Sequence, residues 1–282
     1  IGSRGLGDVY KRQIEYFISL SQLELKPFPL LPEENQFFLR AIYQKFNEKD
    51  TQEIKEIEKT TNHDVKAVEY FIKNKLKGTP MEPYSEFVHF GLTSQDINNT
   101  AVPFSLQLGI DEVIIPAIKN VLEKIVSFAN EWKNIPLLSR THGQAATPTT
   151  VGKEFAVFAE RIQIQLETLI NTPISAKFGG ATGAFNAHRL AFPDVNWPDF
   201  GDRLVNDLGL VRSYPTTQID HYDQLAAVFD ALRRINIILM DFAKDIWQYI
   251  SMDFFKQKIV AGEVGSSACL LYTSDAADEV VS

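Results

Sequence analysis

The 282-residue sequence has a single cysteine, Cys269. One cysteine excludes a disulfide within the chain and a thiolate metal cluster, and such scarcity is typical of the reducing cytosol. Long apolar runs are also lacking: no stretch of about 18 residues is apolar throughout, so we expect no transmembrane helix. The first residues show no charged-then-apolar signal pattern. Together these absences predict a cytoplasmic protein.

Positive charge is the next scarce feature. Lys and Arg number 28 against 36 Asp and Glu, which leaves a formal net charge of −8. Binding to nucleic acid or to an anionic membrane generally needs an excess of positive charge, so we expect neither. A small anionic substrate remains compatible, because a few basic residues concentrated at one site suffice to bind it. The sequence also lacks G-x-S-x-G, which argues against a serine hydrolase.

Both ends of the chain differ from the rest. Residues 1–13 show no regular spacing of apolar side chains, and residues 268–282 break off a recognisable pattern. We interpret both segments as foreign to the natural protein and leave them out of the fold prediction. Ordinary flexible termini are the alternative.

Between these ends, apolar residues recur three and four positions apart, which is the spacing of amphipathic α-helices. We expect helices to begin near Ile14, Pro32, Asp50, Val65, Thr93, Pro116, Phe155 and Ile219. Pro103 is expected to kink or end the helix in which it lies. Residues 219–261 contain neither glycine nor proline, so we expect one helix of about 60 Å there.

Helices of this length need partners along their whole extent. The predicted fold is therefore all-α, with a small N-terminal helical domain at residues 14–92 and a bundle of long helices at residues 93–267. The apolar stripe of the last helix, which includes Leu225, Phe229 and Ile235, is interpreted as core rather than as a cofactor site.

The stretch from Ser139 to Lys153, SRTHGQAATPTTVGK, is the most distinctive part of the sequence. It places Thr141 and His142 among small and hydroxyl-bearing residues, between two helical patterns. Residues this small and polar are not typical of a core. We therefore expect a loop that approaches a ligand closely.

A second polar segment precedes the helix that starts at Val65. Asp64 is expected to cap this helix, which places Asn62 and His63 just before its N-terminus. For His63, an ordinary surface histidine is an equally good interpretation. Lys66 is unfavourable in the first turn of a helix, which indicates an anion nearby.

A third polar segment, Thr93 to Asp96, has the spacing of a capping box. The amides of the helix N-terminus and the Ser94 hydroxyl would point at one spot, which suits a carboxylate or a phosphate. Plain capping without a ligand is the alternative. His89 lies between two apolar residues and is expected to be a core histidine rather than a catalyst.

Two further segments are rich in glycine. Lys177–Gly183 is not a phosphate-binding or dinucleotide loop, because no strand is predicted before it and the lysine precedes the glycines. It is either a flexible connector or a place where the backbone approaches a ligand or a neighbouring subunit. Gly262–Ser267 follows the last helix and is expected to be a mobile loop, with a simple linker as the alternative.

Five segments occur in the order, and at nearly the intervals, of one known family. They are TTNHDVKAVEYF, HFGLTSQDINNT, LLSRTHGQAATPTTVGKE, PTTQI and FKQKIVAGEVGSS. Over about residues 14–267 the chain resembles the adenylosuccinate lyases of bacterial purine biosynthesis. These belong to the superfamily of fumarate-releasing lyases, which includes fumarase, aspartase and argininosuccinate lyase.

The resemblance implies a homotetramer whose long helices form one bundle and whose active sites each combine residues of three subunits. It implies β-elimination of fumarate from adenylosuccinate, which gives AMP, and from the succinylcarboxamide ribotide of purine biosynthesis. No metal or cofactor is implied. The substrate is thus a small anionic purine nucleotide.

The same resemblance assigns roles to single residues. His142 is the general acid, and Ser266 is the general base, which requires a closed, dry and electropositive site. The residues assigned to substrate binding are Asn62, His63, Asp64, Thr93, Ser94, Thr141, Gln218 and Ser267. Lys66 and His89 lie in matching motifs and are further candidates.

The chain departs from the family pattern after Ser267. The family continues with Met-Pro-His-Lys-x-Asn, whose lysine and asparagine bind substrate, whereas Ala268, Cys269 and Leu270 follow here. Segments that hold the phosphate are also missing, so we expect this chain to be inactive by itself. Two alternatives remain open: another fumarate-releasing lyase, such as argininosuccinate lyase, and a non-catalytic helical assembly protein.

Overall fold

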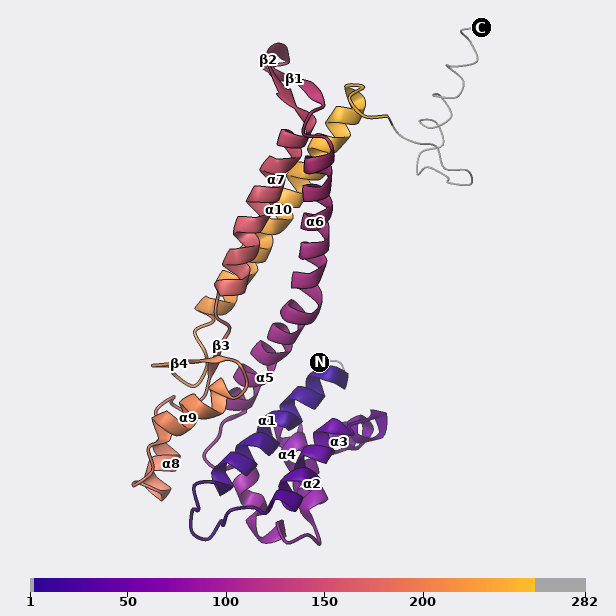
Figure 1. The fold of residues 1–282 in the computed structure, drawn as a ribbon. Helices are drawn as coiled ribbons and strands as arrows, with labels where there is room; N and C mark the ends of the chain where they lie inside the picture. Colours follow the sequence, from indigo (N-terminus) through magenta and orange to yellow (C-terminus); the bar gives the residue numbers. More distant parts are fainter. Residues whose placement is uncertain (1–2, 257–282) are drawn as a thin grey trace. The chain divides into compact units, whose positions relative to one another are not determined.

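The computed structural model describes residues 3–256 and consists mainly of helices (Figure 1). The prediction of an all-α fold is confirmed, with two short two-stranded sheets added. The chain divides into two compact units, Ile1–Ile235 and Asn236–Ser282. The expected boundary after residue 92 stays a prediction.

The first four helices are α1 (Ser3–Ser21), α2 (Glu33–Gln44), α3 (Glu48–Thr61) and α4 (Asp64–Leu76). A 3₁₀ helix η1 (Glu82–His89), α5 (Ser94–Gly109), a π-helical turn η2 (Ile110–Ile114) and α6 (Ile115–Glu131) follow. Then come strands β1 (Pro136–Thr141) and β2 (Gln144–Thr150), α7 (Val151–Asn171) and β3 (Ser175–Lys177). The remaining elements are α8 (Asn186–Ala191), α9 (Trp197–Asn206), β4 (Val211–Ser213) and α10 (Asp223–Ser251).

Helix α1 begins well before the expected start at Ile14. Val9, Gln13 and Phe17 are spaced four residues apart, so they lie on one face of the helix, and all three are buried. The helical spacing of buried residues thus continues upstream of Ile14. It was not recognised in the sequence because one of the buried positions holds a glutamine. Residues 3–13, which were left out of the fold prediction, are therefore part of α1. That they are foreign to the natural protein stays a prediction.

Helices α5 and α6 form one continuous helix from Ser94 to Glu131, joined by η2. Pro103 was expected to kink or end a helix here; the helix does not end at Pro103 but continues through it, and the kink stays a prediction. Proline removes one backbone N–H. The packing of α5 against α1 and α4 offsets this loss, and Pro103 itself is buried in α5.

This continuous helix is long and apolar enough, by length and composition alone, to cross a membrane, which we did not expect from the sequence. One such helix is weak evidence for a span. Asp111 and Glu112 lie side by side in η2, and a carboxylate at the centre of a bilayer costs about 3 kcal/mol or more. Only 11% of the apolar stretch is buried within this chain, so its apolar face is free to pack against other protein.

The stretch predicted as a loop, Ser139 to Lys153, is a β-hairpin followed by the first residues of α7. Strands β1 and β2 pair antiparallel with Thr141 opposite Gln144, so the connection consists of His142 and Gly143 alone. Both residues have positive φ values, 52° and 76°, as a tight two-residue hairpin turn requires. The loop prediction was wrong because alternating small and hydroxyl residues form a strand without a strongly apolar face.

The hairpin joins two helices that lie side by side. Helices α6 and α7 pack against each other. The hairpin connects the C-terminal end of α6 to the N-terminal end of α7, and α5 lies at the opposite end of α6 (Figure 1). Thr150 caps α7 by accepting the Lys153 N–H at 3.2 Å. Most hairpin side chains are exposed within the chain.

Strands β3 and β4 pair in parallel, with Lys177 opposite Ser213. Parallel strands end at the same edge, so the segments that follow them leave from the same side. One of these is the glycine-rich segment after Lys177, and the other is the segment 214–222. Helix α5 packs against β3 at this place.

The last helix is shorter than the expected 219–261. It begins at Asp223 and ends at Ser251, and residues 257–261 lie outside the described part. Before it, Asp220 Oδ2 accepts the backbone N–H of Tyr222 at 3.0 Å, and Tyr222 has a left-handed φ of 60°. The aspartate side chain competes for a backbone amide and so delays the helix.

The apolar stripe of α10 is only partly core within one chain. In the first unit Val228, Ala231 and Ile235 are buried, whereas Phe229, which was predicted as core, is 54% exposed. The buried face therefore shares Ile235 with the predicted stripe but does not include Phe229. An apolar side chain of this size on the outer face is available to contact another chain.

Candidate functional site

The N-terminus of α5 has the predicted capping box. Asp96 Oδ2 accepts the backbone N–H of Thr93 at 2.8 Å, and the Asp96 N–H donates to the Thr93 carbonyl at 3.0 Å. Thr93 and Ser94 are half-buried at this helix end. Free amides and the helix dipole favour an anion there.

Asp96 is fully buried, which capping alone does not require. Its Oδ1 accepts hydrogen bonds from Lys177 Nζ at 2.6 Å and from the backbone amides of Gly179 and Gly180 at 2.9 and 3.0 Å. Lys177 is also fully buried, and its Nζ donates to the Gly180 carbonyl at 2.6 Å. Burial lowers the pKa of Lys177, and the negative charge of Asp96 opposes this effect.

The glycine-rich segment therefore binds a carboxylate of its own chain. The interpretation as a flexible connector is wrong, because Lys177, Gly179 and Gly180 all contact the same side chain. Neither the role of Asp96 as an anchor nor that of Lys177 as its partner was predicted from the sequence. The available signal was a lone lysine between buried apolar residues, which needs a buried anion.

Gln218 is distant from Thr93 in the sequence but contacts the same helix end. Its Nε2 donates to Thr93 Oγ1 at 3.1 Å, across 125 positions. The structure thus brings together three of the predicted substrate-binding residues, Thr93, Ser94 and Gln218. We refer to these three residues as the α5 site.

Asn99, one turn further along α5, holds the chain just after Gln218. Its Oδ1 accepts the backbone N–H of Asp220 at 2.7 Å, and its Nδ2 donates to the Tyr222 hydroxyl at 2.9 Å. Asn99 is buried and lies three residues after Asp96, which places both side chains on one face of the helix. The sequence analysis did not single it out.

The N-terminus of α4 differs by one residue from the prediction. His63, rather than Asp64, is the N-cap, and its Nδ1 accepts the Lys66 N–H at 3.3 Å. Asp64 is the first helical residue, and its Oδ1 accepts the next backbone N–H at 2.8 Å. Asn62 caps the end of α3 in a left-handed conformation, so only Asn62 and His63 lie between α3 and α4. The side chains of Asn62, His63 and Asp64 are exposed.

A charged cluster links this helix end to His89. Glu69 is buried, and it accepts hydrogen bonds from Lys66 Nζ at 2.6 Å and Lys73 Nζ at 2.9 Å. Burial acts to raise the Glu69 pKa, but the two lysines outweigh it, so the pKa is below its ordinary value. Burial lowers the pKa of His89, which contacts Gln13 Nε2 through Nδ1 at 3.1 Å.

His142 lies at the exposed tip of the hairpin. Its left-handed backbone conformation costs a residue with a Cβ about 1–2 kcal/mol, and asparagine or glycine is preferred in such turns. Arg140 Nη1 donates to the Gly143 carbonyl at 3.2 Å and braces the turn. A histidine held in a strained and exposed position is a candidate for function. Thr141 precedes it and is likewise exposed.

One chain does not bring His142 to the α5 site. Ser94 starts the continuous helix, and the hairpin follows its other end, 38 residues later and roughly 57 Å away. The remaining predicted residues, Ser266 and Ser267, lie outside the described residues. Within the described part, the α5 site and the hairpin tip are therefore separated by the length of the continuous helix.

A buried histidine close to Asp96 also escaped the sequence analysis. His188 is fully buried, and the rings of Phe90, Phe185 and Trp197 surround it at centroid distances of 4.7–5.4 Å. Its Nε2 lies 3.0 Å from the Tyr16 hydroxyl. Because that hydroxyl donates its proton to the Phe90 carbonyl at 2.6 Å, the Nε2 of His188 must carry the proton.

The His188 Nδ1 then has no hydrogen-bond partner within residues 3–256, and a second proton there would be buried unsatisfied. Burial lowers the pKa of His188 to about 4, an effect that the charge of Asp96 opposes and that of Lys177 reinforces. The difference from the ordinary value of 6.5 corresponds to about 3 kcal/mol of stability. This contribution is complete above pH 6.5 and is lost as the pH falls towards 4.

We therefore expect His188→Phe to remove this part of the acid sensitivity. Unfolding in urea at a series of pH values from 7 to 4.5 measures it, since the phenyl ring fills the aromatic cage and takes up no proton. His221→Gln, at an exposed position, serves as the matched control. An unchanged difference in stability between pH 7 and 4.5 in His188→Phe would contradict the assignment.

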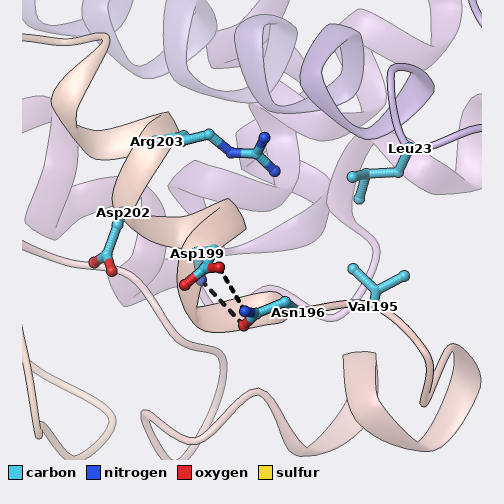
Figure 2. Close-up of a pocket in the computed structure, with 6 residues that line it drawn as sticks. All are labelled: Leu23, Val195, Asn196, Asp199, Asp202 and Arg203. Atoms are coloured by element: carbon cyan, nitrogen blue, oxygen red, sulfur yellow. Dashed lines mark hydrogen bonds between the residues drawn. The ribbon is translucent and has the colours of Figure 1, made fainter.

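A surface cavity of about 520 Å³ lies beside α9 (Figure 2). Leu23 and Val195 face it from one side, and Arg203 extends into it, with Asn196, Asp199 and Asp202 completing the lining. None of the candidate residues lines this cavity. It therefore does not mark the candidate site.

Comparison with solved structures shows which known proteins share this fold. The crystal structure of a fumarate lyase from Mesorhizobium sp. BNC1 matches with a TM-score of 0.73 and 18% identity, covering 89% of this chain and 56% of that chain. A cycloisomerase, beta-carboxy-cis,cis-muconate cycloisomerase of Acinetobacter calcoaceticus, matches with a TM-score of 0.69 and 16% identity, covering 89% and 56%. These likenesses show the fold, which enzymes with different reactions share.

The sequence shows the family to which the chain belongs. The family described as "Lyase" matches residues 33–269, and the chain belongs to this family. It is 54% identical over 263 residues to the adenylosuccinate lyase of Dictyostelium discoideum, a match that covers 90% of this chain and 56% of that protein. It is 48% identical to the adenylosuccinate lyase of Vibrio cholerae, covering 86% and 54%. The chain thus spans about half the length of these curated relatives.

Proposed function

We propose that this chain is part of an adenylosuccinate lyase. The enzyme would release fumarate from adenylosuccinate, giving AMP, and from the succinylcarboxamide ribotide of purine biosynthesis. The observation that carries the proposal is the hydrogen bond between Gln218 and Thr93. It unites two residues that the family pattern independently assigns to substrate binding. The identity of 54% to a relative of that name supports the same substrate.

The proposed reaction starts at the succinyl group of the substrate. Ser266, as the base, takes a proton from Cβ, and the electron pair spreads onto the neighbouring carboxylate. The N-terminus of α5, with Thr93 and Ser94, is suited to bind such a carboxylate as it gains charge. The electron pair then forms the C=C bond of fumarate as the C–N bond breaks, the electrons of the broken bond pass to nitrogen, and His142 donates a proton there. No metal or cofactor enters this scheme.

The proposed active site needs more than one chain. His142 and the α5 site are at opposite ends of a 38-residue helix, so both can serve one substrate only if different chains supply them. The hairpin that carries His142 is exposed, and an isolated two-stranded hairpin is marginally stable. Val113, Val121 and Ile164 are exposed on the long helices, at 64%, 42% and 48%. We propose a homotetramer, located in the cytoplasm, in which neighbouring chains cover these surfaces.

Fumarate release by the full-length protein that carries this chain tests the proposal. Adenylosuccinate and argininosuccinate are supplied separately, and fumarate is measured by its absorbance. We expect the full-length protein to release fumarate from adenylosuccinate and not from argininosuccinate. The 282-residue chain by itself is expected to release fumarate from neither. Release from argininosuccinate would favour the other lyase, and no release from either by the full-length protein would favour a non-catalytic assembly protein.

A further inference from the structure

The α5 site is assembled at the common edge of the parallel strands β3 and β4. The glycine-rich segment follows β3, and the segment that ends in Gln218 follows β4. Gly183 brings the two together: a Cβ on this glycine would lie 2.2 Å from the Thr216 carbonyl oxygen, and its φ of +77° also suits glycine. The two segments are therefore in backbone contact, two residues before Gln218.

Asp96 connects this edge to the helix that carries Thr93 and Ser94. One carboxylate oxygen accepts the Thr93 amide, and the other accepts Lys177 and the amides of Gly179 and Gly180. Each oxygen thus holds a different segment of the chain. All of these bonds are between 2.6 and 3.0 Å, and both charged side chains are inaccessible to solvent.

The contacts form a closed ring around the α5 site. From Thr93 the ring passes through Asp96 to the glycine-rich segment, then through Gly183 to Thr216, and through Gln218 back to Thr93. Asn99 adds a second link, since it binds the amide of Asp220 on the other side of Gln218. Every member is held from two directions, as a preorganised binding site requires.

We infer that Asp96 is a positioning residue for the proposed lyase: together with Lys177, it holds Thr93 and Ser94 in register with Gln218, so that their polar groups converge on one substrate carboxylate. The inference rests on the proposed function. Asp96 is buried and does not touch the substrate itself. It acts through the backbone of Thr93 and through the glycine-rich segment.

Asp96→Asn distinguishes the link from Asp96 to Thr93 from the link to the glycine-rich segment, because it replaces one carboxylate oxygen by an NH₂ group. The amide oxygen keeps its place towards Lys177, Gly179 and Gly180, where three donors converge. The NH₂ group then faces the Thr93 N–H, and two donors oppose each other. The variant therefore breaks the link to Thr93 and keeps the hydrogen bonds to the glycine-rich segment, while the buried Lys177 loses its countercharge.

We expect Asp96→Asn in the full-length protein to lower kcat/KM for adenylosuccinate by about 10²-fold, mainly through a higher KM. Direct calorimetric binding of fumarate, used as a simple dicarboxylate probe, is expected to weaken in parallel. Hydrogen exchange of the amides in segment 91–97 is expected to accelerate. Leu39→Ala, a buried change in α2, is the matched control, because it lowers stability without touching the ring.

Gly183→Ala provides a second variant in case Asp96→Asn does not fold. The added Cβ would push Thr216, and with it Gln218, away from Thr93, so the KM is expected to rise as well. A KM and a fumarate affinity that stay at wild-type values in a folded variant, or exchange at 91–97 that stays unchanged, would overturn the inference. A wild-type protein that releases no fumarate would overturn the proposed function instead, and the fumarate-binding and exchange measurements would still decide the role of Asp96.

Discussion

Lys177→Met is expected to lower the free energy of unfolding of this chain by about 3–5 kcal/mol, because it leaves the buried Asp96 carboxylate without its countercharge. Methionine fills similar space but supplies no positive charge. Three backbone amides still donate to Asp96, from Thr93, Gly179 and Gly180, which places the expected loss towards the lower end of the range. Urea unfolding at pH 7 measures the change.

The matched control for this prediction is an ion pair of similar length on the surface. Lys55 Nζ lies 2.7 Å from Glu58 Oε2, and the Lys55 side chain is 54% exposed. Lys55→Met is expected to cost at most about 1 kcal/mol, because water solvates the remaining charge. Equal losses of unfolding free energy in the two variants would show that burial does not increase the contribution of the Lys177–Asp96 pair to stability. The comparison thus isolates the effect of burial from that of the ion pair itself.

His142→Asn is expected to lower the kcat of the full-length protein by about 10²–10⁴-fold, the usual contribution of a positioned general acid. Asparagine suits the left-handed backbone at this turn better than histidine does, so the hairpin is expected to be as stable as before, or more so. The change therefore removes the proposed proton donor without loosening its support. Steady-state rates and thermal unfolding of the same sample distinguish the two effects.

Mixing variants tests whether the site is shared between chains. Gln218→Ala damages the α5 site and His142→Asn damages the hairpin tip, so a mixed assembly contains some sites that take both intact residues from different chains. We expect activity to recover in this mixture. A mixture of His142→Asn with Thr141→Val is the control: both damage the hairpin, so no site receives an intact one. Failure of the first mixture to recover, although mixed assemblies form, would contradict the shared site.

The helices were predictable because their signal is local. Apolar residues three and four positions apart define α6 and α7, and the capping box at Thr93 and Asp96 marks the start of α5. The errors occurred where local rules compete. Gln13 occupied a buried position with a polar side chain, and Asp220 delayed the start of α10.

The sequence by itself determined the helical class and, through five motifs in order, the residues that the family pattern assigns to the site. It could not show that Gln218 meets Thr93, that Asp96 is buried against Lys177, or that Tyr16 pairs with His188. These contacts join residues about 80 to 170 positions apart, and nothing in the local spacing of a chain encodes such a distance. Only the tertiary structure decided them, because a buried charge or donor selects its partner by where the packed helices and strands place it.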